Sequence, residues 1–146
     1  MNIKQALKLK NKLVKENNDT YTKLSSYNSV EEGGVRPYNP KDMLAKWNEG
    51  VKQLVDLKTR IHRANAPVYD KIFKLAELKS MVSKLNSMNC VEGKQSSRGR
   101  WGDVGEPLIY QAEIGIVQRD EMTKTLEAQI EQLQDELDVH NSNTEI

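Results

Sequence analysis

The residues with the clearest binding chemistry lie in one short segment, positions 94–101. Lys94, Arg98 and Arg100 supply cationic donors, and the neighbouring glycines let backbone N–H groups approach an anion closely. Trp101 offers a flat ring on which a purine could stack. This combination favours a nucleotide-like ligand. The same residues also suit a basic edge strand that resists aggregation and is anchored by its tryptophan, so both interpretations stay open.

A second group of cations stands where two expected helices meet. Arg60, His62 and Arg63 come shortly before Asn65. The first N–H groups of the following helix have no partner within that helix, so two arginines one turn away could complete an anion site. Alternatively, these cations only cap the C-terminal end of the preceding helix. The candidate ligand-binding residues are Lys94, Arg98, Arg100, Trp101, Arg60, Arg63 and Asn65.

Residues suited to catalysis or metal binding are sparse. His62 and His140 each stand near the end of an expected helix, where the helix dipole favours a cationic side chain. Ser96 and Ser97 have no neighbouring histidine that could act as a base. Cys90 is the single cysteine, so neither an internal disulfide nor a cysteine metal cluster can form. We therefore expect no enzyme activity, no metal and no cofactor.

Four helices and one hairpin are expected to position these residues. Apolar side chains recur at steps of three and four, and Asn39-Pro40 reads as a helix cap followed by a proline in the first turn. The predicted fold class is mainly α, an antiparallel helical bundle with a long coiled-coil-like C-terminal helix and one β-hairpin before it. The chain is expected to be a single domain over 1–146. The helices are predicted over 2–27, 40–63, 67–88 and 117–140, and the hairpin over about 96–114.

The expected core is a set of narrow apolar stripes. Only 37% of the residues are hydrophobic, which is lean for 146 residues and favours self-association. An isolated hairpin is marginal in water, so it should lie on the helices or pair with hairpins of other subunits. The stripes are Ile3, Leu7, Leu13, Val14, Tyr21 and Leu24; Leu44, Trp47, Val51, Leu54, Leu57 (or the stem of Lys58) and Ile61; Val68, Ile72, Leu75, Leu78, Val82 and Leu85; and Met122 or Thr123, Leu126, Ile130, Leu133, Leu137 and His140.

The net charge of +1 hides an asymmetry along the chain. Residues 1–115 hold 20 Lys/Arg against 13 Asp/Glu, whereas residues 116–146 hold 2 against 8. These charges form either solvated faces that attract one another, within or between subunits, or a basic surface for a phosphate-bearing ligand. A nearly neutral chain with one local basic patch favours a small ligand over nucleic acid as the partner. The sequence shows no signal peptide and no membrane span, so a cytoplasmic protein is expected.

Several short motifs follow one another along nearly the whole chain. They are Ala6-Leu7-Lys8, Val30 to Pro37, Asn39 to Leu44, Ile61 to Asn65, Arg98 to Trp101 with Glu113-Ile114, Leu126 to Asp138, and Asn143 to Ile146. In this order they resemble a septicolysin-like family of small helical bacterial and phage proteins. The resemblance implies a helical fold with a β-hairpin, in an oligomer. The family label implies a pore-forming lysin, but no segment here is membrane-insertive. Trp-Gly after the arginines and the short Ala66–Asp70 link depart from the pattern, so ligand residues need not transfer.

These observations favour a non-enzymatic oligomeric binding protein with basic interface pockets for a small phosphate-bearing ligand. Phage proteins that sequester nucleotide immune signals have this general build, so a sponge for a host signalling nucleotide is one form of the hypothesis. The first alternative is a structural or scaffolding coiled-coil protein, whose basic body docks on its acidic helix without a small ligand. The second is a nucleic-acid-associated factor.

Overall fold

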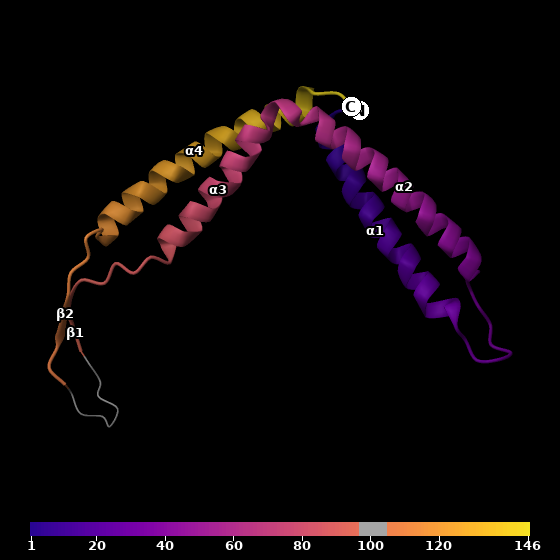
Figure 1. Cartoon of the computed structure of the whole chain (residues 1–146), viewed down its shortest axis with the longest axis horizontal. Coiled ribbons are helices and arrows are strands. Elements are labelled where there is room, and N and C mark those ends of the chain that lie inside the picture. The colour runs from indigo at the N-terminus through magenta and orange to yellow at the C-terminus, as the bar shows by residue number, and fades with distance from the viewer. Residues whose placement is uncertain (97–104) are drawn as a thin grey trace. The chain divides into compact units, whose positions relative to one another are not determined.

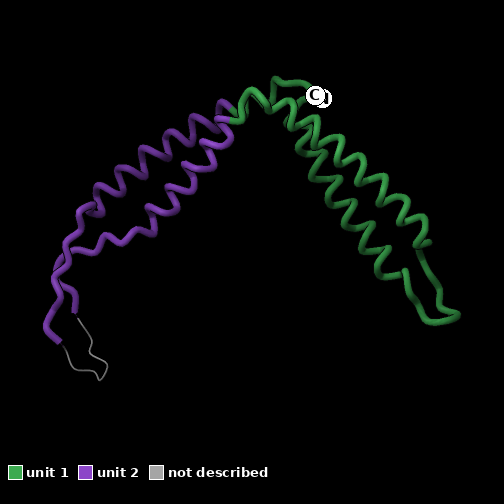
Figure 2. Tube along the Cα trace, viewed as in Figure 1, with its two compact units in different colours: residues 1–69, 137–146 green, residues 70–136 purple. Residues whose placement is uncertain are grey.

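The computed structural model describes residues 1–96 and 105–146, which form two compact units. The first unit contains residues 1–69 and 137–146, and the second contains residues 70–136 (Figure 2). The predicted mainly α fold with one hairpin is confirmed (Figure 1). The elements are α1 (Ile3–Asn28), α2 (Pro40–Ala64), the 3₁₀ turn η1 (Ala66–Val68), α3 (Tyr69–Asn86), β1 (Gly93–Gln95), β2 (Leu108–Tyr110) and α4 (Ile116–Asn143).

Local capping explains where the first two helices begin. The side chain of Asn2 accepts a hydrogen bond from the Gln5 N–H at 2.9 Å, and the Gln5 side chain accepts one from the Asn2 N–H at 3.1 Å. This reciprocal capping box satisfies two N–H groups that the helix leaves unpaired. At α2, Asn39 Oδ1 accepts from the Lys41 N–H at 2.9 Å and Pro40 follows the cap. The predicted start of the second helix is therefore confirmed.

In the first unit α1 and α2 lie side by side and pack closely (Figure 1). Ala6 is fully buried against Leu57 and Ile61, which are 4% and 8% exposed. Small residues set the distance between the helices. A Cβ atom added at Gly50 would lie only 1.9 Å from Asn17 Oδ1, so a larger residue at position 50 would have to displace the Asn17 side chain of α1. Three partly buried side chains complete this cluster, namely Leu7, Leu13 and Ile146.

The two ends of the described chain meet in the first unit. The Ile3 N–H donates to the Thr144 carbonyl at 3.0 Å, and the Ile146 N–H donates to the Met1 carbonyl at 2.9 Å. These bonds cover Ile3, whose side chain is fully buried. Together they place the C-terminal turns of α4 in the same unit as the start of α1.

The predicted stripe of α2 is correct only in part. Leu57 and Ile61 are buried and two other members, Trp47 and Leu54, are partly covered, but Leu44 and Val51 are 45% and 41% exposed. Val55, which the predicted stripe does not include, is 59% exposed. Helical periodicity places positions 44, 51 and 55 roughly 100° away from the line that faces α1. Because α1 is the main element packed on α2 among the described residues of this unit, it covers one line of α2 and leaves the other open.

One further core assignment needs correction. Tyr21 is 51% exposed, although its ring lies against Trp47 with the ring centroids 5.2 Å apart. In α4 one of the two predicted alternatives is confirmed, since Thr123 is buried, at 8% exposed, while Met122 is 38% exposed.

In the second unit α3 packs against α4. The predicted stripe of α3 is confirmed, since Leu78 is buried and the other α3 members are at least partly covered. An ion pair of 2.7 Å joins Lys71 Nζ on α3 to Glu136 Oε2 on α4. That contact raises the pKa of Lys71 and lowers the pKa of Glu136, chiefly through the hydrogen bond between the two side chains.

The paired strands begin before the predicted hairpin start at about 96, and β2 ends at Tyr110, before the predicted end at about 114. Predicted hairpin residues 97–104 lie outside the described residues. β1 and β2 pair antiparallel over three residues each, with Lys94 opposite Ile109. Gly93 has a φ of +81°, a conformation that favours glycine where the chain enters β1. All six strand residues are exposed, so the strands do not pack on the helices. Pairing with hairpins of other subunits stays a prediction.

Candidate functional site

The best-supported candidate is the basic segment carried by the hairpin. We call residues 93–110 the arm. In its described part the Lys94 side chain stands opposite Ile109, which is 70% exposed, and Leu108 is 55% exposed. The strands therefore present the base of the basic segment to solvent. Arg98, Arg100 and Trp101, the other predicted binding residues of the arm, lie outside the described residues.

The junction after α2 is built differently from the prediction. The Asn65 N–H donates to the Ile61 carbonyl at 3.0 Å and closes the last turn of α2, which ends at Ala64. The next helical residues form the three-residue 3₁₀ turn η1, and α3 begins only at Tyr69. The N–H groups expected to hold an anion next to Asn65 thus belong to a short turn, which has a weaker dipole than an α-helix. An anion site here stays a prediction.

The cations of this junction have local roles. Arg60 and Arg63 are one turn apart and exposed, and Arg60 Nη1 lies 3.9 Å from Asp56 Oδ2. The Tyr69 hydroxyl contacts His62 Nδ1 and donates to the His62 carbonyl at 2.9 Å. These contacts tie the end of α2 to the start of α3.

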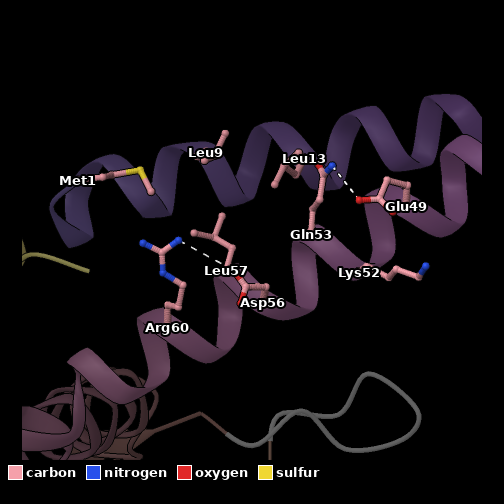
Figure 3. Close-up of a pocket in the computed structure, with 9 residues that line it drawn as sticks. All are labelled: Met1, Leu9, Leu13, Glu49, Lys52, Gln53, Asp56, Leu57 and Arg60. Atoms are coloured by element: carbon pink, nitrogen blue, oxygen red, sulfur yellow. Dashed lines mark hydrogen bonds and ion pairs between the residues drawn. The ribbon is translucent and has the colours of Figure 1, made fainter.

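A groove runs between α1 and α2 in the first unit, and Arg60 lies at its edge (Figure 3). Its volume is about 420 Å³. The apolar side chains come from both helices, and the rim carries two cations and two carboxylates, with Arg60 directed toward Asp56. The balanced rim gives no net attraction for an anion. The lining residues are Met1, Leu9, Leu13, Glu49, Lys52, Gln53, Asp56, Leu57 and Arg60.

The connector between α1 and α2 holds a polar pocket that sequence reasoning missed. Arg36 Nε donates to the Tyr27 carbonyl at 3.0 Å and so caps the end of α1. The ring of Tyr38 lies 5.7 Å from the ring of Tyr27, and Lys23 Nζ lies 4.8 Å from the Tyr38 ring centroid. Arg36, Tyr38 and Lys41 border a pocket of about 580 Å³. The sequence signal that could have indicated this pocket is Arg36 and Tyr38 just before the Asn39 cap of α2.

The described parts of the chain offer few other functional features. Residues 1–96 and 105–146 contain no group of three His, Cys, Asp or Glu side chains placed to hold a metal ion. None of the helices described above combines the length and apolar character needed to cross a membrane.

Comparisons with known proteins add no relative. No family model, no curated protein and no solved structure matches this chain. The septicolysin-like resemblance therefore stays an expectation from the sequence.

Proposed function

We propose that this chain is a non-enzymatic, oligomeric binding protein that sequesters a small phosphate-bearing, nucleotide-type ligand in basic pockets at its subunit interfaces. One observation carries the proposal: the strands at the base of the arm cover no core. All six strand residues are exposed, so Lys94 is not required to shield an apolar layer beneath it. The sequence between these exposed strands is basic and glycine-rich and contains a tryptophan, a composition suited to binding.

An assembly supplies what a single arm lacks. A cation on an exposed strand attracts a phosphate only weakly, because water screens the charge and ion pairs at surfaces contribute about 0–1 kcal/mol each. Several arms around one ligand add their cations and exclude water, which strengthens each contact. The lean core and the exposed apolar side chains, Ile109 and Val51 among them, support association of copies.

The proposed ligand class is tested by thermal unfolding of the full chain with nucleoside mono- and triphosphates, cyclic dinucleotides and inorganic phosphate. A nucleotide present at about 100 times its dissociation constant should stabilise the folded state by about 2.7 kcal/mol. R100E and K94E should abolish the shift. K46E, an equal charge change at an exposed position of α2, should preserve it. The absence of a shift with every nucleotide would refute the proposal.

Two variants separate the candidate sites. If R36E abolishes the shift and R100E preserves it, the ligand binds in the connector pocket beside Arg36 and not on the arm. If R60E alone abolishes it, the junction after α2 is the site. A scaffolding role remains if the chain forms an oligomer and no nucleotide changes its stability. Affinity for duplex DNA that falls steeply with added salt would favour a nucleic-acid-associated factor.

The ligand class also bears on the biological setting. If a cyclic dinucleotide or another signalling nucleotide stabilises the chain more than the other ligands do, the result would favour a phage-type sponge for a host immune signal. That extension rests on the analogy of build, small chains in assemblies with cationic pockets.

A further inference from the structure

α2 carries a second apolar stripe that points away from its own core. Leu44, Val51 and Val55 are 45%, 41% and 59% exposed. Their spacing of seven and four places them within about 40° of one another on the helix surface. The stripe lies roughly 100° from the line through Ile61 that faces α1. We call these three residues the outer stripe.

The outer stripe continues across the side of the first unit. Tyr21 of α1 is 51% exposed and its ring lies 5.2 Å from that of Trp47 on α2. Five large apolar side chains therefore border one side of the helix pair. Together they expose on the order of 400 Å², as large as the biggest apolar patch of a typical monomer and about half of what one partner buries in a standard interface. Two such contacts would make one stable interface.

Charge argues against the outer stripe meeting its own copy face to face. Lys41 and Lys58 lie within about 60° of the stripe, so two stripes in contact would bring four lysines together. The two units of the chain have opposite charge. The first unit has 13 Lys/Arg against 9 Asp/Glu, and the second has 9 against 12. The complement of the basic first unit is thus the acidic second unit of another copy.

The second unit offers a matching apolar surface. A groove between α3 and α4 is bordered by Met81 and Met122, which are 46% and 38% exposed, with Leu126 beside them and Glu121 at the rim. Methionine side chains adapt to the shape of a partner. Glu121 is an acidic neighbour for an incoming lysine.

We infer that two copies of this chain form a reciprocal dimer. The outer stripe of each copy docks on the Met81–Met122 groove of the other, and each dimer contains two equivalent contacts. The inference specifies the interface of the oligomer in the proposed function and needs no ligand. The association of the two copies is therefore measured without nucleotide.

The test is sedimentation equilibrium of the full chain from about 1 to 100 μM, with circular dichroism to verify folding. The wild-type chain should be dimeric, and V51E should weaken the dimer about tenfold or more, because the interface would bury an unpaired carboxylate. K46E, on the opposite side of α2, should leave the dimer unchanged. K58E and E121K should each weaken it, and the double variant K58E/E121K should restore association to near the wild-type level.

Several outcomes would overturn the inference. They are a wild-type chain that stays monomeric at 100 μM, V51E that associates as well as K46E, or a K58E/E121K double variant as weak as its two single variants. The nucleotide-induced shift is read separately. An oligomer that persists in V51E contradicts this interface and leaves the ligand proposal standing. If V51E dissociates the dimer but no nucleotide shifts the unfolding temperature of any chain, the interface is supported and the ligand proposal is contradicted.

Discussion

At Gly50 the packing of α1 on α2 leaves little room for a larger side chain. A Cβ atom there would lie 1.9 Å from Asn17 Oδ1 and 2.9 Å from Asn17 Cγ. G50A must therefore displace the Asn17 side chain or separate the helices. Overpacking of this kind costs about 1–3 kcal/mol. Replacing glycine by alanine inside a helix gains about 1 kcal/mol from helix propensity, so G50A should range from neutral to about 2 kcal/mol less stable.

Removing Asn17 should reverse the sign. In an N17A background the clash is gone, and G50A should then stabilise the chain by about 1 kcal/mol. N17A itself should cost little, because Asn17 Nδ2 is buried without a hydrogen-bond partner among the described residues. The two substitutions are therefore expected to be coupled by about 1–3 kcal/mol.

Thermal unfolding of the four chains, at one protein concentration, measures this coupling. One kcal/mol corresponds to about 3 °C in Tm for a chain of this length. G50A should lower Tm or leave it unchanged in the wild-type background, and should raise it by about 3 °C in the N17A background. An equal increase in both backgrounds would refute the close approach of the two helices at this position.

Two further predictions concern packing and charge. L57A should lower the free energy of unfolding by about 2–5 kcal/mol, because Leu57 is 4% exposed at the centre of the first unit. V139A, at a 61% exposed position, should change it by no more than about 0.5 kcal/mol. Chemical denaturation measures both variants, and equal losses of stability would contradict the placement of the core. E136Q should lower Tm at pH 7, because it breaks the 2.7 Å pair with Lys71. The pKa of Glu136 is lowered in the folded state, so its stabilisation is present above the pKa of an unfolded glutamate and is lost as the pH falls through the lowered pKa. The Tm difference should therefore disappear in acid, and a difference that persists there would exclude the ion pair as its cause.

The sequence was sufficient for the elements whose causes are local. Asn39-Pro40 predicts the start of α2 because a side-chain acceptor followed by proline satisfies the first turn wherever the helix lies. The stripe of α3 through Leu78 was likewise readable, since a helical period of apolar residues needs no knowledge of the partner. The glycines and the apolar run predict the hairpin, but they do not predict that strand pairing begins as early as Gly93.

Tertiary structure decided which apolar residues are core and what surrounds the candidate site. The sequence of α2 contains two apolar lines, and only the position of α1 shows that Ile61 is buried while Val51 is exposed. The pocket beside Arg36 joins the end of α1 to the start of α2, so it does not exist in either segment alone. The exposure of Lys94 and its neighbours could not be read from their residue types either, because burial depends on what packs against a strand. The basic segment itself was evident from the sequence alone, since charge and ring chemistry belong to the residues and not to their neighbours.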